Sequence, residues 1–141
     1  MSPVEILTKV AQLIETECDD VLQQIQEDLY LSVHVKDVDI IITQCHERQD
    51  YLIFKSSVGS MDFEAANALK VTQFLLEANF EWSGTRGSTL GVNSNTGEIC
   101  LFYSATSVNA DVNAIIAFLS IFADTVKEWN ELLDHLVTSG D

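Results

Sequence analysis

Basic residues are scarce in this sequence. Only 7 of its 141 residues are Lys or Arg, against 22 Asp or Glu, and the formal net charge at pH 7 is -15. No two of the seven basic residues lie close enough in sequence to form a local patch. Nucleic-acid binding depends on neutralising phosphates, and an anionic membrane attracts polybasic segments, so both partners are disfavoured. The charge instead favours partners that carry basic segments.

Cysteines, long apolar runs and signal-peptide features are also few or lacking. The three cysteines, Cys18, Cys45 and Cys100, are an odd number at wide spacings, which favours free thiols in a reducing compartment. Residues 1–17 contain no basic segment followed by an apolar one, and the longest apolar run, 114–123, is too short to span a bilayer. We therefore expect a soluble cytoplasmic protein with no membrane insertion.

The apolar residues that are present suffice for a folded core. The hydrophobic content is 47% and the mean hydropathy is positive, which argues against disorder despite the high charge. A chain of 141 residues fits one domain, residues 1–141, with a single core. The acidic residues must then lie on the surface around it.

The N-terminal pattern predicts a helix that begins at Pro3. Ser2 is placed as the N-cap and Glu5 as its partner three residues later, which is the arrangement of a capping box with Pro at the first helical position. Apolar residues then recur at helical spacing to about Thr16. A break or a second short helix is expected before Leu29.

From Tyr30 onward the apolar residues alternate with polar ones, which is typical of strands. The segments 30–36, 38–43 and 51–56 are predicted to form a three-stranded antiparallel meander. Lys36 and Asp37 supply a tight turn between the first two strands. One face of this meander is much more apolar than the other, so we expect helices to cover that face.

The stretch 65–80 predicts a second helix. Ser60, Asp62 and Glu64 mark its expected start, because acidic side chains in a first turn complement the helix dipole. Its apolar residues occupy more than one stripe, so the helix needs two partners. One is expected to be its own sheet and the other a second subunit, with complete burial inside the chain as the alternative.

A hairpin and a long helix complete the chain. The hairpin strands are predicted at 88–92 and 98–103, with Gly97 at the positive-φ position of the turn. The last helix is expected to begin near Asn109 or Asp111. Its apolar side consists of Ile115, Leu119, Phe122, Val126, Trp129, Leu133 and Leu136. The order α-β-β-β-α-β-β-α predicts an α+β fold with a twisted antiparallel sheet packed by helices.

No recognisable motif groups the side chains that carry catalysis or metal binding. Cys45 and His46 are adjacent, but neighbours on a strand point to opposite faces and no further ligand lies at zinc spacing. The loop 84–87 follows a helix and lacks the lysine of a phosphate-binding loop. We therefore expect a protein that is not an enzyme and uses no metal and no cofactor. The alternative is an unrecognised catalytic site, which a deep polar pocket would reveal.

The second half of the chain resembles a known family. The closest likeness is Leu75-Leu-Glu-Ala-Asn-Phe80, a glycine-containing loop, Thr89-Leu-Gly-Val92, an Asn/Gly turn and a final helix with an aromatic-acidic ending around Trp129. In these features and in element order, the chain is similar to the class I chaperones of bacterial type III secretion systems, the Tir-chaperone family. The likeness covers roughly residues 61–137.

The resemblance implies a homodimer in the bacterial cytoplasm that holds the N-terminal chaperone-binding region of one or more secreted effectors. The effector stays extended, soluble and competent for secretion, and the secretion ATPase is a further candidate partner. Dimer contacts are expected from the second helix and the adjacent hairpin, at Leu69, Gln73, Leu76, Phe80, Leu90 and Val92. The alternative on the same scaffold is a regulatory protein that sequesters a transcriptional regulator of the secretion system.

The apolar pattern also predicts how an effector would bind. An extended segment can add a strand to an exposed sheet edge and insert alternate apolar side chains into grooves. We expect the grooves to be lined by Leu7, Val10, Ile14, Val33, Val35, Ile40 and Phe54.

Overall fold

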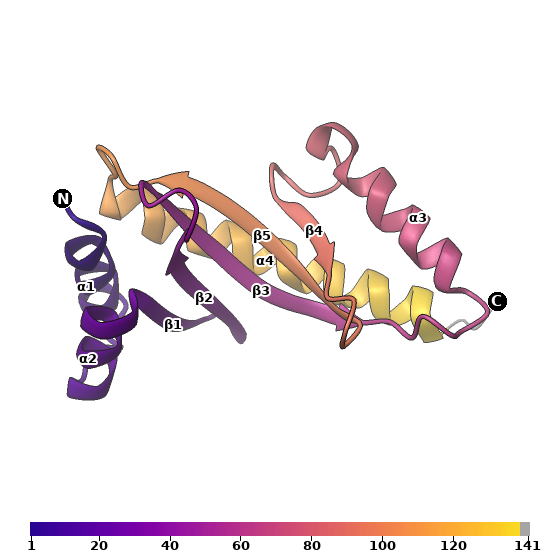
Figure 1. The fold of residues 1–141 in the computed structure, drawn as a ribbon, viewed down its shortest axis with the longest axis horizontal. Helices are drawn as coiled ribbons and strands as arrows, with labels where there is room; N and C mark the ends of the chain where they lie inside the picture. The colour runs from indigo at the N-terminus through magenta and orange to yellow at the C-terminus, as the bar shows by residue number, and fades with distance from the viewer. Residues whose placement is uncertain (139–141) are drawn as a thin grey trace. The chain divides into compact units, whose positions relative to one another are not determined.

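The computed structural model describes residues 1–138, and Figure 1 shows its helices and strands. The elements are α1 (Pro3–Leu13), α2 (Asp19–Asp28), β1 (Tyr30–Val35), β2 (Val38–Gln44), β3 (Tyr51–Ser60), α3 (Ala68–Asn79), the 3-10 helix η1 (Phe80–Trp82), β4 (Thr89–Val92), β5 (Glu98–Thr106) and α4 (Val112–Thr138). The strands form a sheet in the order β1-β2-β3-β5-β4. The predicted α+β class and element order are confirmed, with α2 as the expected second short helix.

The chain divides into two compact units. Unit 1 consists of residues 1–55 and 104–123, and unit 2 consists of residues 56–103 and 124 onward. Strands β3 and β5 and helix α4 contribute residues to both units. Each unit buries apolar side chains of its own.

Helix α1 of unit 1 begins as predicted. The Ser2 hydroxyl oxygen accepts a hydrogen bond of 3.2 Å from the backbone N–H of Glu5, and Pro3 occupies the first helical position. The helix buries Ile6, Leu7, Val10 and Ala11. Glu15, in the break that follows, has a positive φ of 58°. The helix ends at Leu13, before the predicted end near Thr16. Of the two predicted alternatives before Leu29, a break and a second short helix, the structure has both.

The strands of unit 1 pair in antiparallel register. Val35 of β1 lies opposite Val38 of β2, so Lys36 and Asp37 form a two-residue turn. Both turn residues have positive φ, 50° and 65°, as a type I′ hairpin turn requires. Pairing of β2 with β3 continues the meander in antiparallel register. The predicted apolar face is buried and consists of Leu31, Val33, Val38, Ile40, Ile42, Leu52 and Phe54.

Helix α4 starts in unit 1, and Asp111 is its cap. The Asp111 carboxylate accepts a 2.9 Å hydrogen bond from the N–H of Asn113. The ring of Phe118 meets Phe54 of β3 edge-on, with 5.3 Å between centroids. Leu119 and Phe122 are also buried. Of the two predicted starting points, Asp111 is the one observed.

The predicted start of the second helix is wrong. Strand β3 extends to Ser60, and α3 begins only at Ala68. The Asp62 carboxylate accepts a 2.9 Å hydrogen bond from the N–H of Glu64, which is two residues away. That local contact forms a turn instead of a first helical turn, because aspartate side chains stabilise both arrangements.

The β4–β5 hairpin of unit 2 follows the prediction. Leu90 pairs with Leu101 in antiparallel register, and Gly97 has a positive φ of 79°. The N–H of Met61 donates a 2.9 Å hydrogen bond to the Gly97 carbonyl, so the turn lies directly against the end of β3. The apolar core of unit 2 includes Val71, Leu75, Leu90, Ile99, Leu101, Val126, Trp129 and Leu133. No helix within residues 1–138 is long and apolar enough to cross a membrane.

Candidate interaction surfaces

Helix α3 buries one side and exposes apolar side chains on another. Val71 and Leu75 are buried, whereas Leu69, Leu76 and Phe80 are 70%, 65% and 72% exposed. The spacing of Leu69, Gln73, which is also exposed, and Leu76 places three residues on one side of the helix. Phe80 directly follows the helix as its C-cap. We call Leu69, Gln73, Leu76 and Phe80 the α3 stripe. Soluble chains rarely expose so many large apolar side chains in one place unless a partner covers them.

The two remaining predicted dimer residues lie on β4. Val92 is 36% exposed, but Leu90 is only 5% exposed and belongs to the core of unit 2. Val92 is therefore accessible to a second chain, whereas Leu90 supports the strand from inside.

Two asparagines hold the ends of α3. At its start, Asn67 Nδ2 donates a 3.2 Å hydrogen bond to the Leu136 carbonyl of α4. At its end, Asn79 Nδ2 donates to the Leu90 carbonyl at 2.9 Å, and Asn79 Oδ1 accepts from the Leu90 N–H at 2.8 Å. The α3 stripe is thus presented by a helix anchored at both ends.

The loop after α3 is tied to α4. Trp129 Nε1 donates a 2.9 Å hydrogen bond to the Gly84 carbonyl. The Arg86 guanidinium donates at 2.9 Å to the hydroxyl of Thr125 and at 2.9 Å to the carboxylate of Glu128. Glu128 raises the pKa of Arg86 through this contact, so the guanidinium stays charged. These contacts fix the loop that leads out of η1.

Two exposed aromatic residues near the α3 stripe in sequence were not predicted as interaction residues. Phe63 precedes α3 and is 48% exposed, and Trp82 ends η1 and is 56% exposed. Trp82 adopts a positive φ of 56°, and its Nε1 donates a 3.3 Å hydrogen bond to the Thr89 hydroxyl. The sequence offered one signal for these two residues, which is their position just outside a helix that is apolar on two sides. They belong to no periodic stripe, so the pattern of apolar residues did not point to them.

The predicted effector-binding residues all lie in unit 1, and most of them build its core. Leu7, Val10, Val33, Ile40 and Phe54 are at most 2% exposed. Ile14, next to the end of α1, and Val35, at the end of β1, are half-buried. The structure thus brings the buried five into one core, and their contact with an effector stays a prediction.

The two terminal strands of the sheet differ in how their edges are occupied. Strand β4 is one edge, and both backbone polar groups of Leu90 are taken by the Asn79 side chain. Strand β1 is the other edge. An edge strand pairs with an added segment through unpaired backbone groups, so the Asn79 contact disfavours β4 for that role.

An open cleft lies on unit 1 between α1 and the start of α4. It has a volume of about 720 Å³ and is lined by Met1, Lys9, Gln12, Leu13 and residues 110–113. Leu13 is 56% exposed and Met1 is 51% exposed. The cleft combines apolar side chains with one lysine and one aspartate.

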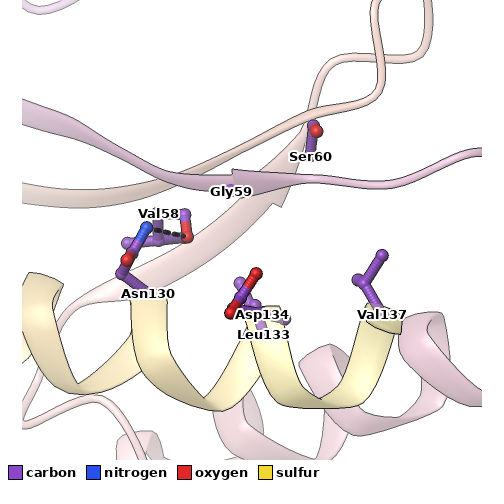
Figure 2. A pocket seen from close by; sticks show the side chains of 7 residues that line it. All are labelled: Val58, Gly59, Ser60, Asn130, Leu133, Asp134 and Val137. Carbon is purple, nitrogen blue, oxygen red and sulfur yellow. Dashed lines mark hydrogen bonds between the residues drawn. The ribbon is translucent and has the colours of Figure 1, made fainter. Parts of the chain in front are cut away.

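A second cleft, of about 220 Å³, lies in unit 2 between the end of β3 and the last turns of α4 (Figure 2). Its lining residues are Val58, Gly59, Ser60, Asn130, Leu133, Asp134 and Val137. Asn130 Nδ2 donates a 3.1 Å hydrogen bond to the Val58 carbonyl and joins the two walls. Among the lining residues that the structure describes, Asp134 is the only titratable one.

One histidine, His34, forms a contact across a hairpin, and the three cysteines differ in exposure. His34 Nδ1 lies 2.8 Å from Asp39 Oδ1 across the β1–β2 hairpin, and this hydrogen bond raises the pKa of His34 above its usual value. Cys18 is exposed, Cys45 half-buried and Cys100 buried. Within residues 1–138, no three His, Cys, Asp or Glu side chains are grouped so that they could hold a metal ion.

Comparison with known families agrees with this architecture. Residues 15–130 match the model of the Tir chaperone protein (CesT) family, so the chain belongs to that family of chaperones. The resemblance inferred from the sequence is thereby confirmed. A search of curated proteins found no match.

Solved structures share the fold at low sequence identity. The ExsC–ExsE complex aligns with a TM-score of 0.67 and 18% identity over 92% of each chain. The HopA1–SchA chaperone–effector complex aligns at 0.62 and 12%, over 90% of this chain and 91% of the other. The heterodimeric ExoU–SpcU complex from the type III secretion system of Pseudomonas aeruginosa aligns at 0.55 and 19%, over 77% and 82%.

Proposed function

We propose that this protein is a cytoplasmic type III secretion chaperone that binds the N-terminal chaperone-binding region of one or more effectors in extended form. The observation that carries the proposal is membership of the Tir chaperone family over residues 15–130. Structures described as a chaperone–effector complex and as a complex from a type III secretion system share the fold. Residues 1–141 act as one secretion-chaperone domain in this proposal, and the secretion ATPase is a further partner.

The chaperone works as a homodimer through the α3 stripe. Leu69, Leu76 and Phe80 would each be removed from water when a second copy of α3 covers them, which supplies the hydrophobic driving force for association. A two-fold interface uses the same patch on both subunits, so a single helix face is sufficient. Val92 and Gln73 lie at the same interface.

The effector segment is added at strand β1. Backbone hydrogen bonds at a strand edge provide affinity without strict sequence requirements, and side-chain pockets provide selectivity. Ile14 and Val35, which are half-buried, form the rim of the groove. The buried residues Leu7, Val10, Val33, Ile40 and Phe54 form its floor. The net charge of -15 attracts basic effector segments.

Affinity purification of the tagged chain from its native cytoplasm tests this proposal. A secreted protein retained through its N-terminal region is the expected prey. A DNA-binding regulator as the main prey would instead favour the regulatory alternative on the same scaffold. Retention of no polypeptide at all would contradict both functions.

A further inference from the structure

The cleft at the end of β3 has a chemistry that strand addition and dimerisation do not use. Figure 2 shows Asn130, Asp134 and Val137 of α4 on one side, with Gly59 and Ser60 of β3 on the other. Its volume of about 220 Å³ is below the range of about 300–1,000 Å³ typical of sites for cofactors and drug-sized ligands. The cleft is therefore matched to a single side chain.

The polar groups of this cleft are predominantly hydrogen-bond acceptors. Asp134 carries the only charge among the lining residues, and within residues 1–138 its carboxylate forms no ion pair or hydrogen bond. The amide nitrogen of Asn130 is used on the Val58 carbonyl, which leaves its oxygen as an acceptor. Figure 2 shows the Ser60 side chain directed away from α4, so Asp134 and Asn130 supply the acceptors. A cationic donor suits this set.

The remaining walls of the cleft are apolar and leave room for an alkyl chain. Val58, Leu133 and Val137 line it. At Gly59, an added Cβ would lie 3.7 Å from both Cβ and Cδ1 of Leu133, in ordinary van der Waals contact. A side chain at position 59 would narrow the cleft, and its backbone would also be strained, because Gly59 has a φ of 158° that L residues rarely adopt.

We propose that this cleft binds an arginine side chain of the effector polypeptide. The guanidinium presents several N–H donors in a fixed plane, which matches one carboxylate with an amide oxygen beside it. The three-carbon stem of arginine lies along apolar surfaces while its charged head reaches polar groups. The inference depends on the proposed function only for the identity of the partner as an effector.

Peptide titration of the full-length protein, followed by ¹H–¹⁵N NMR, tests the cleft directly. The probe is acetyl-Gly-Arg-Gly-amide, and its control contains citrulline, which is neutral and almost isosteric with arginine. We expect the arginine peptide to shift the amide signals of Gly59, Ser60, Asn130 and Asp134. The citrulline peptide should produce at most weak shifts there. Equal shifts with both peptides, or none at the cleft, would overturn the inference.

Substitutions separate the cleft from the general acidity of the surface. Asp134→Asn should weaken binding of the arginine peptide about fivefold, the upper end for an exposed ion pair. Glu131→Gln removes an exposed carboxylate of α4 that does not line the cleft, and it should leave binding unchanged. Equal effects of Asp134→Asn and Glu131→Gln would show diffuse charge attraction and overturn the inference.

The peptide titration and the affinity purification test the two proposals separately. If the tagged chain retains an effector but the arginine peptide does not bind the cleft, only this inference is wrong. If the peptide binds as expected but no effector is retained, the cleft stands and the chaperone function is wrong.

Discussion

The indole N–H of Trp129 donates a 2.9 Å hydrogen bond to the carbonyl of Gly84. Trp129 lies on α4 and is only 3% exposed, and its ring meets Phe74 of α3 edge-on with 5.6 Å between centroids. One buried side chain therefore contacts both α3 and the loop that follows η1. We therefore expect Trp129 to hold α3 and this loop in place next to the α3 stripe.

Trp129→Phe should lower the free energy of unfolding by about 2 kcal/mol, because it leaves the Gly84 carbonyl without its donor and removes part of a buried ring. Urea denaturation measures this change. Glu128→Gln is the control: it weakens only the pair with Arg86, whose side chains are 51% and 56% exposed, and should cost less than about 1 kcal/mol. Equal costs for the two variants would contradict the role of Trp129.

Asn79→Ala should lower the free energy of unfolding by about 1–2 kcal/mol, because both hydrogen bonds to the Leu90 backbone are lost. The exchange of the Leu90 amide hydrogen, measured by NMR, should also become faster. Thr72→Ala removes an exposed side chain of α3 that bonds only to its own helix and should leave that exchange rate unchanged. An unaltered Leu90 amide in the Asn79 variant would refute the proposed protection of the β4 edge.

Gly97→Ala should destabilise the fold more than Gly87→Ala does. Both glycines have positive φ, 79° and 87°, so each substitution carries a backbone cost of about 1 kcal/mol or more. A Cβ at Gly97 would also overlap the Met61 carbonyl oxygen, whereas a Cβ at Gly87 would lie 4.0 Å from its nearest neighbour, Tyr103 Cε2. Thermal unfolding should therefore show a larger loss for Gly97→Ala, and the reverse order would contradict the turn geometry.

His34 should titrate above the ordinary histidine pKa of about 6.5. The hydrogen bond that the His34 ring donates to the Asp39 carboxylate is the main cause of this raised pKa, with a further contribution from Asp37. Because the folded-state pKa is raised, the stabilisation is complete below about 6.5 and is lost as the pH rises through the folded-state value. NMR titration should give a lower His34 pKa in Asp39→Asn, with a smaller decrease in Asp37→Asn. A His34 pKa unaffected by Asp39→Asn would rule out this cause.

The sequence predicted the elements whose local signals agree with their packing. Three such signals are each compatible with only one local structure. They are the Ser2–Glu5 cap, the two-residue period of β1 and β2, and Gly97 in its turn. The predicted start of α3 was wrong because an aspartate followed by acidic residues stabilises a turn as well as a helix. The end of β3 was missed because residues 56–60 contain serine and glycine, which have low strand preference.

The interaction surfaces were harder to predict than the fold. The two-sided apolar pattern of α3 indicated an exposed stripe, and Leu69, Leu76 and Phe80 are indeed exposed. Alternation along a strand separates two faces but does not tell whether a helix or a partner covers the apolar one. For that reason Leu7, Ile40 and similar residues could not be assigned to core or groove from the pattern. The cleft around Asp134 joins segments about 75 residues apart, which no local pattern reveals.

The central claim is that the α3 stripe joins two copies of the chain. Size-exclusion chromatography with light scattering tests it most directly, by comparing the wild type with Leu76→Glu. Leu132→Glu is the matched control, because Leu132 is 48% exposed on α4 and lies outside the stripe. We expect twice the 15.7 kDa chain mass for the wild type and for Leu132→Glu, and the single-chain mass for Leu76→Glu. A wild type at the single-chain mass, or a Leu76→Glu variant that remains a dimer, would contradict it.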